Sequence, residues 1–331
     1  MLDGFALVLL AALCQGSFLV PMTRTRNWAW EHTWAAFCLF SMLALNWLFS
    51  FAFLPNPFSI YASVPRHDLI MLVLFGAGWG VGAILFGLGM ERLGLALGYP
   101  LIMGLSASAG ALVPMFWSSQ TSFASVRGLI VTGSVAIAVG GIAVCSVAGA
   151  RKESSMKAGP TGFSSGLLIA VAAGLLCCLP NLGMAFGASA VGAATALGAP
   201  PGSANNVVWC IFFTVGGLVN LTYCVLRMMQ RGNTKKLIAP EVLRNSSLAA
   251  GMALMWMGSF YLYGLGASKM GLWGAIIGWP VLISVSIGVG IAWGLWKGEW
   301  KHAPGSARRI LVGGLVLILT AVLTLAMSNA V

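Results

Sequence analysis

The sequence predicts an all-α integral membrane protein in which ten transmembrane helices form two inverted five-helix repeats. Hydrophobic residues make up 59% of the 331 residues and charged residues only 8%. A typical soluble domain contains about 25% charged residues, so a soluble chain of this length is excluded. The lengths of the apolar runs and a segment that occurs twice are the other two observations behind this prediction.

Ten apolar runs are long enough to cross a bilayer, whose hydrocarbon core requires about 20 helical residues. Helices are the expected form, because alternation typical of barrel strands is absent and the runs are unbroken. The first run lacks the basic start and small-residue cleavage site of a signal peptide, so we interpret it as a retained span. The expected spans are residues 4–23, 33–53, 69–90, 94–117, 128–149, 165–187, 205–226, 247–267, 271–296 and 309–328.

The basic residues predict the orientation of these spans. With the N-terminus outside, only Arg66, Arg127 and Lys269 of the 18 Lys and Arg residues fall in outside gaps. Cytoplasmic loops carry the excess of basic residues in membrane proteins, so both termini are expected on the periplasmic side. The net charge of +11 therefore follows the membrane topology. No basic stretch is interleaved with exposed aromatic residues, and nucleic acid is excluded as a partner.

A polar segment divides the chain into two halves. Residues 151–164 contain Gly159 and Pro160, are predicted to be cytoplasmic, and are interpreted as a linker. The first repeat is then expected at residues 1–150 and the second at residues 165–331. No gap between spans is long enough to form an independent soluble domain.

The two halves share a repeated segment. "GLGMERLGL" at 87–95 reappears as "GLGASKMGL" at 264–272, and "GYP" at 98–100 reappears as "GWP" at 278–280. Each half holds five spans, and this odd number inverts the second half in the membrane. Inverted repeats are typical of secondary transporters, which bind their substrate near the midplane. Aligned identities are Trp79/Trp256, Leu85/Leu262, Gly87/Gly264, Leu88/Leu265, Gly89/Gly266, Gly94/Gly271 and Leu95/Leu272.

Four segments resemble the L-rhamnose/proton symporters of the drug/metabolite transporter superfamily. They are "VPMTRTRNWAWEHTW" at 20–34, "LPNPF" at 54–58, "LFGAGWGVGAILFGLGMERLGLALGYPLIMG" at 74–104 and "GLWKGEW" at 294–300. The resemblance implies a multi-pass protein of the bacterial inner membrane that imports L-rhamnose or a related deoxy-sugar by proton symport. The alternative is another small-metabolite transporter, or an exporter, of the same superfamily.

A neutral sugar needs aromatic faces, hydroxyls and amides rather than fixed charges. Trp79 and Trp256 are candidates because both are expected near the middle of a span, away from the interfaces where Trp usually concentrates. Packing between the repeats is the competing interpretation of these two rings, and hydrogen bonding between helices competes for the polar candidates. Trp28, Trp30 and Trp34 are expected in an interfacial belt. The expected substrate-binding residues are Gln15, Trp79, Tyr99, Ser106, Asn181, Trp256, Tyr263 and Trp279.

No acidic or histidine residue falls at the centre of an expected span, so the proton-coupling candidates lie at span ends. Glu31 precedes the second span on the cytoplasmic side, and Asp68 precedes the third span on the outer side. An ordinary interfacial charge is the alternative for each. We expect a proton or another cation as coupling ion and the lipid bilayer as surroundings. No reactive constellation, cofactor motif or metal-ligand spacing is present, so an enzyme is not expected.

Overall fold

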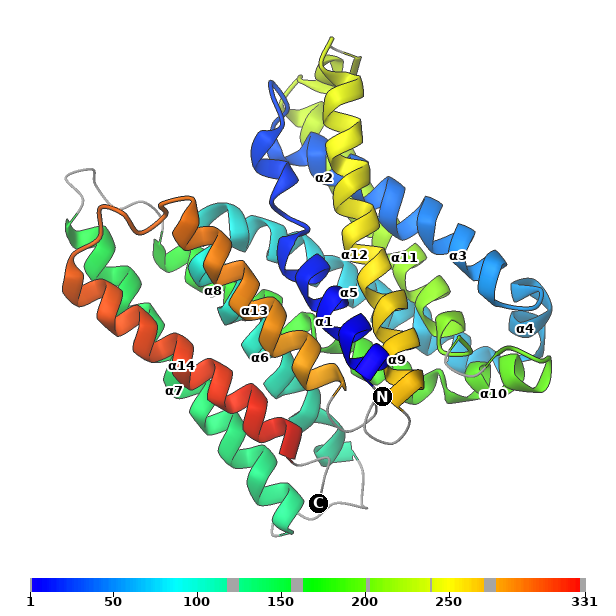
Figure 1. Cartoon of the computed structure of the whole chain (residues 1–331). Helices are drawn as coiled ribbons and strands as arrows, with labels where there is room; N and C mark the ends of the chain where they lie inside the picture. Colours follow the sequence, from blue (N-terminus) through cyan, green and yellow to red (C-terminus); the bar gives the residue numbers. More distant parts are fainter. Residues whose placement is uncertain are drawn as a thin grey trace. The chain divides into compact units, whose positions relative to one another are not determined.

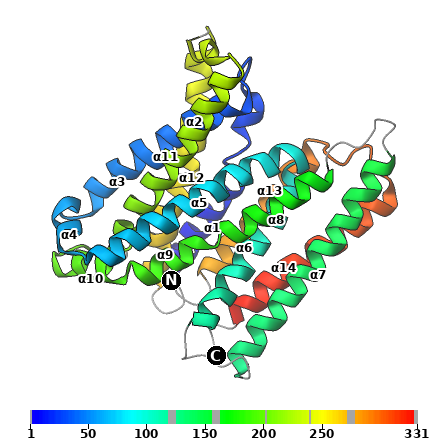
Figure 2. The ribbon, with the colours of Figure 1, turned by 180° about the vertical axis from the view of Figure 1, so that it is seen from behind.

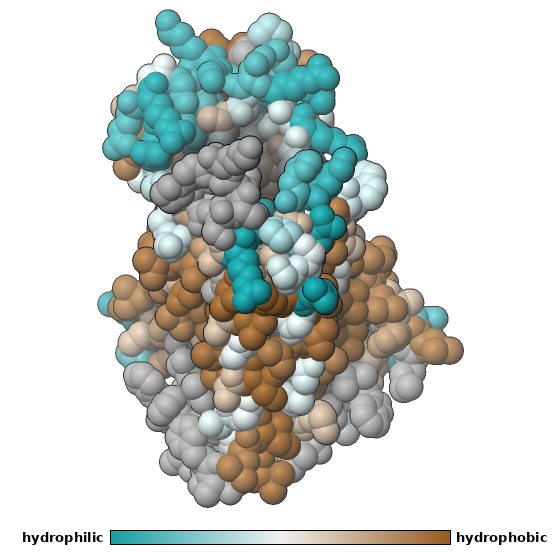
Figure 3. Space-filling view, turned by 90° about the vertical axis from the view of Figure 1, so that its left-hand side faces the viewer, coloured by the Kyte–Doolittle hydropathy of each residue, from teal (hydrophilic) through white to brown (hydrophobic). Residues whose placement is uncertain are grey.

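The computed structural model describes residues 2–117, 125–155, 163–200, 203–238, 240–270 and 278–327, and within these ranges all regular elements are helices. In the described part of the chain, six helices are long and apolar enough to cross a membrane, and four shorter apolar helices accompany them. On the face drawn in Figure 3, hydrophobic side chains cover much of the helix flanks, while hydrophilic ones gather where helices end. The chain is therefore an all-helical, multi-pass membrane protein.

The helices form two compact units, and each unit combines residues from both halves of the sequence. Unit 1 contains Met1–Ile84 and Leu179–Gly271, and unit 2 contains Leu85–Cys178 and Leu272–Val331. These units group residues in space, whereas the expected halves at 1–150 and 165–331 divide the sequence. The division into repeats therefore stays a prediction.

Unit 1 is built around three long helical segments that pack on one another (Figure 1). The segment from Trp30 to Phe53 lies against α11 and α12, and α1 packs along α12. The elements of this unit are α1 (Leu2–Ser17), η1 (Pro21–Arg24), α2 (Trp30–Cys38), η2 (Leu39–Leu45), α3 (Asn46–Phe53), α4 (Pro57–Ser63), the first part of α5 (Arg66–Leu93), α9 (Leu179–Phe186), α10 (Ala188–Ala196), α11 (Asn206–Gln230), η3 (Thr234–Ile238) and α12 (Val242–Met270).

Unit 2 contains an extensively packed helix pair, in which α7 and α14 lie side by side in both ribbon views (Figures 1 and 2). Helix α6 packs against α7, α8, α13 and α14, so it forms the centre of the unit. Besides the end of α5, the elements are α6 (Leu95–Trp117), α7 (Val126–Ser155), α8 (Phe163–Leu176), α13 (Trp279–Trp296) and α14 (Gly305–Met327).

The junction of α5 and α6 shows how the repeated segment directs the backbone. Gly94 adopts a positive φ of 78°, which glycine accepts without steric cost, and its N–H donates to the Met90 carbonyl at 3.0 Å. Both carboxylate oxygens of Glu299 accept hydrogen bonds at 3.0 Å, from the N–H groups of Leu95 and Ala96. The "GLWKGEW" segment thus caps the start of α6.

Several expected spans differ from the observed helices. Residues 165–187 form two helices, α8 and α9, separated by a turn at Cys177 and Cys178. Pro180, the second residue of α9, has no N–H to continue a hydrogen-bonded helix. Short helices α4 and α10 occupy gaps between expected spans, and residues 271–277 of the ninth expected span lie outside the described residues.

Pro100 and Pro280, the prolines of the repeated "GYP" and "GWP" segments, differ in their position along their helices. Pro280 lies at the start of α13, where a missing N–H costs little, whereas Pro100 lies in the second turn of α6 and the helix continues past it. In unit 1 the segment from Trp30 to Phe53 is continuous, but its middle, η2, is a π-helical turn. Such turns often mark functional positions.

Candidate substrate and proton sites in unit 1

Trp79 and Trp256, which the repeat alignment pairs, meet face to face inside unit 1. Their ring centroids lie 6.0 Å apart with an interplanar angle of 21°. Phe213 of α11 contacts both rings, at centroid distances of 5.1 and 5.0 Å. We call the surrounding set of contacting rings the aromatic cluster; its members are Phe37, Trp79, Trp209, Phe212, Phe213, Trp256 and Phe260.

The absence of a side chain at Gly216 allows the Trp79 ring to approach α11 closely. A Cβ added to Gly216 would lie 2.6 Å from the Trp79 ring, closer than real Cβ atoms approach a neighbour. Within the described part of the chain, neither the Trp79 nor the Trp256 indole N–H donates a hydrogen bond. A buried indole N–H usually has a partner, so each of these two donors is suited to a ligand hydroxyl.

Gln15 and Ser259 bring polar groups to the same region. The buried Ser259 hydroxyl lies 2.6 Å from Gln15 Oε1 and 2.7 Å from the Trp256 carbonyl oxygen, and its single proton serves one of these acceptors at a time. Ser259 follows Trp256 by three residues on α12, so both side chains lie on one helix face. Tyr263, one turn further along α12, is half-buried.

A buried hydrogen-bond junction supports the aromatic cluster. The Trp34 indole N–H donates to Asn220 Oδ1 at 2.8 Å, and Asn220 Nδ2 donates to the carbonyls of Gly80 at 2.9 Å and Gly216 at 2.8 Å. The expectation that Trp34 belongs to an interfacial belt is wrong, because the ring is buried and hydrogen-bonded in the core of unit 1. No local pattern in the sequence indicates this partnership, because Trp34 and Asn220 lie 186 positions apart.

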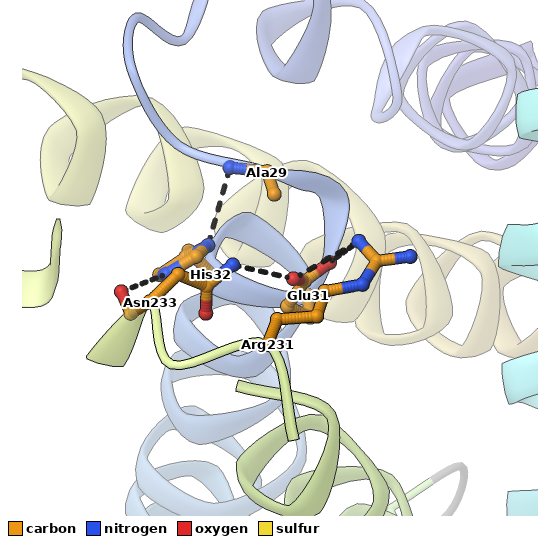
Figure 4. Close-up of polar contacts among 5 residues, drawn as sticks. All are labelled: Ala29, Glu31, His32, Arg231 and Asn233. Atoms are coloured by element: carbon orange, nitrogen blue, oxygen red, sulfur yellow. Dashed lines mark hydrogen bonds and ion pairs between the residues drawn. The ribbon is translucent and has the colours of Figure 1, made fainter. Parts of the chain in front are cut away.

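Glu31 forms a buried ion pair at the start of α2. Its carboxylate accepts hydrogen bonds from Arg231 Nη1 at 3.1 and 3.2 Å and from Asn233 Nδ2 at 3.0 Å (Figure 4). The side chain of Glu31 is only 3% exposed, whereas that of Arg231 is 48% exposed. Among the described side chains Glu31 is the only buried carboxylate. Its partners lie about 200 positions away in sequence, which is why sequence reasoning did not find them.

The neighbouring His32 is held by two backbone groups, as Figure 4 shows. The Ala29 N–H donates to His32 Nδ1 at 3.1 Å, and His32 Nε2 lies 3.0 Å from the Asn233 carbonyl oxygen. Because a backbone N–H can only donate, Nδ1 must accept and is unprotonated. The remaining ring proton is therefore on Nε2 and is donated to Asn233, so His32 is a neutral structural link in this conformation.

Asp68 lies at the start of α5, against α10. Its Oδ2 accepts a hydrogen bond from the Ser189 hydroxyl at 2.6 Å, and its Oδ1 lies 3.2 Å from His67 Nδ1. The Asp68 side chain is 24% exposed and the His67 side chain is 66% exposed. The carboxylate of Asp68 is therefore more exposed to solvent than that of Glu31.

The remaining expected site residues belong to other parts of the structure. Tyr99 is fully buried in unit 2, where its ring faces Gly290 of α13, and Ser106 is half-buried on α6. Asn181 lies on α9 and Trp279 opens α13, but their side chains are outside the described set. Within that set, no group of three or more His, Cys, Asp or Glu residues is placed to hold a metal ion.

Comparisons with known proteins give one family along almost the whole chain. A family model described as "L-rhamnose-proton symport protein" matches residues 2–329. A protein of Klebsiella pneumoniae (strain 342) named "L-rhamnose-proton symporter" is 30% identical over 326 residues, which cover 95% of this chain and 94% of that protein. Proteins with the same name from Mannheimia succiniciproducens and Pectobacterium atrosepticum are 29% and 30% identical over 325 residues. These matches cover 94% of this chain, and 94% and 93% of the two relatives.

Proposed function

Because the chain belongs to the L-rhamnose-proton symport protein family, we propose that it imports L-rhamnose or a related deoxy-sugar together with protons. The observation that carries this proposal is the family match over residues 2–329. The family is one of transport proteins, and its model extends over both compact units. The proposed location is the bacterial inner membrane, with both termini on the periplasmic side.

The proposed architecture is ten helices in two inverted repeats that expose one site alternately to each side of the membrane. Two features support it. Residues paired by the sequence repeat, Trp79 and Trp256, stack on each other, as residues near a two-fold axis between repeats do. In addition, each compact unit combines residues from both halves of the sequence.

The proposed sugar site in unit 1 centres on Trp79 and Trp256, with Gln15, Ser259 and Tyr263 as hydroxyl and amide partners. In this structure the faces of the two indole rings are covered by each other and by Phe213. When the pair separates, a ring face becomes free for the C–H face of a sugar, and each N–H reaches a hydroxyl. Tyr99, Ser106, Asn181 and Trp279 remain proposed contributors.

Glu31 and Asp68 are the proposed proton-coupling groups. Glu31 is supported by burial, by its single cationic partner and by the rarity of carboxylates inside membrane segments, where such groups are usually functional. Asp68 is the proposed proton acceptor at the opposite predicted side. Its partial exposure and its contacts with Ser189 and His67 support a group that exchanges protons with water.

Uptake of labelled L-rhamnose into vesicles that contain the purified protein tests the proposal. An inward gradient of one pH unit should drive accumulation of up to about tenfold for one proton per sugar, because one pH unit corresponds to about 1.4 kcal/mol. Collapse of the gradient should abolish accumulation. Uptake that is unaffected by the proton gradient would contradict proton symport. An absence of rhamnose uptake would favour another small metabolite as the substrate.

A further inference from the structure

Hydrogen bonds join the loop before α2 to the start of α12 and to the segment between α11 and α12 within unit 1. The Arg26 N–H donates to Asn245 Oδ1 at 3.1 Å, and Asn245 Nδ2 donates back to the Arg26 carbonyl at 2.8 Å. Asn27 Nδ2 donates to Glu241 at 2.7 Å, and the Trp28 indole N–H donates to the Lys236 carbonyl at 2.9 Å. These hydrogen bonds connect the backbone segments that carry Glu31, Arg231 and Asn233, so they restrict the position of the ion pair.

Few charged or titratable groups face Glu31. His32 is the neighbour on its own helix, α11 contributes the thiol of Cys224, and Arg231 directly follows the last residue of α11. Helix α12 also packs against α2, but among the described residues it places no charged side chain on Glu31. Arg231 is therefore the cation that balances the carboxylate. Loss of this cation would leave a buried charge unpaired, which is strongly unfavourable.

His32 is unsuited to take the proton in place of Glu31. A proton on Nδ1 would face the Ala29 N–H, which is itself a donor, and the hydrogen bond of 3.1 Å would be lost. The bond from Nε2 to the Asn233 carbonyl keeps the ring in place. A proton that arrives at this cluster is therefore held by the Glu31 carboxyl group.

Asn233 offers hydrogen-bonding capacity to both forms of Glu31. Its Nδ2 donates to the carboxylate, while its buried Oδ1 has no partner among the described residues. A protonated Glu31 has an O–H to donate, and rotation of the Asn233 amide by half a turn presents Oδ1 as the acceptor. An unpartnered buried acceptor normally costs about 1–3 kcal/mol, so the protonated form satisfies a group that is unsatisfied here.

We propose that Arg231 is the cation that exchanges with the transported proton on Glu31, and that Asn233 hydrogen-bonds the carboxyl group in both forms. The inference rests on the proposed role of Glu31 in proton coupling. When a proton binds Glu31, the carboxylate loses its charge and the guanidinium of Arg231, already 48% exposed, moves to water. When the proton leaves, Arg231 returns, so the buried carboxyl group never stays charged and unpaired.

The test is an infrared pH titration of the full chain in lipid bilayers, in which the Glu31 band is identified as the carboxyl absorption that disappears in Glu31→Gln. Removal of a nearby opposite charge should raise the midpoint of this band in Arg231→Gln by about 1–3 pH units. Arg231→Lys, which keeps a cation, should stay close to the wild type. Arg244→Gln, at an exposed basic position of the same predicted cytoplasmic end, is the matched control and should leave the midpoint unchanged.

Transport by the same variants links the exchange to function. Arg231→Gln should lose proton-driven accumulation near neutral pH but keep exchange of labelled for unlabelled sugar at equal pH, which shows that it is folded. An unshifted infrared midpoint in Arg231→Gln overturns the role of Arg231, whatever the substrate is. Normal accumulation by Glu31→Gln overturns the proton role of Glu31, and an absence of rhamnose transport by the wild type overturns the proposed substrate alone.

Discussion

The two compact units bury different polar chemistry. Among the described residues, unit 1 buries a carboxylate, an imidazole and several amides, namely Glu31, His32, Gln15, Asn46, Asn220 and Asn245. The buried polar side chains described in unit 2 are hydroxyls alone, those of Ser108, Ser134 and Ser286. The difference lies in the kind of group rather than in the amount of apolar packing.

The partners of these groups also differ. In unit 2, Ser286 donates to the Ile283 carbonyl of its own helix. The Ser134 hydroxyl of α7 contacts the Ile130 carbonyl of its own helix and lies 2.9 Å from the Thr324 hydroxyl of α14, so this described link between two helices is made by hydroxyls. In unit 1, the amides of Asn220 and Gln15 join helices far apart in sequence. The comparison supports the proposal that the sugar and proton sites centre on unit 1, with Tyr99, Ser106 and Trp279 of unit 2 as further proposed contributors.

Replacement of Trp256 should produce the largest change in substrate affinity. Loss of a ring contact costs about 0.5–1.5 kcal/mol and loss of an indole hydrogen bond about 1 kcal/mol, so Trp256→Ala should raise the KM for uptake by roughly 10- to 70-fold. Trp256→Phe keeps a ring and should have an intermediate effect. The matched control is Trp296→Ala in unit 2, whose side chain is 72% exposed. Equal KM values for the Trp256 and Trp296 variants would show that the stacked Trp79–Trp256 pair contributes to packing and not to sugar binding.

An effect on stability rather than on affinity is expected from the hydrogen-bond junction that supports the aromatic cluster. Asn220→Ala leaves the Trp34 N–H and the Gly80 carbonyl without their observed partner, and each buried unsatisfied group costs about 1–3 kcal/mol. Thermal unfolding in detergent should therefore show a clearly lower Tm. Thr222→Ala, at an exposed position on the same helix, should change the Tm little. If the Asn220→Ala and Thr222→Ala variants have the same Tm, the hydrogen bonds of Asn220 do not stabilise the fold.

The smallest effect is expected in unit 2, at the cap of α6. Glu299→Ala removes two hydrogen bonds to the helix N-terminus, and loss of such a cap costs about 0.5–2 kcal/mol. Because Glu299 is expected to act on stability alone, the Tm should fall while the KM stays near the wild-type value. Glu91→Ala, at an exposed carboxylate near the end of α5, is the control. A large rise in KM in Glu299→Ala would contradict the division of roles between the units.

Much of the helical architecture followed from simple features of the sequence. Apolar runs predicted helices close to α7, α11 and α14, since a helix in lipid must satisfy its own backbone and expose apolar side chains. The division between α8 and α9 had a signal, because Pro180 interrupts the expected span at 165–187. The pairing of Trp79 with Trp256 had the repeat itself as its signal.

The sequence by itself determined that the chain is a helical membrane protein, and its resemblance to the symporter family is confirmed by the family model. These properties depend on composition, run length and short motifs, which are local. The tertiary structure decided that Glu31 is buried beside Arg231, that Trp34 bonds to Asn220, and that Ser259 reaches Gln15. Burial and hydrogen-bond partnership depend on side chains some 180 to 250 residues apart, and no local pattern encodes which of them meet.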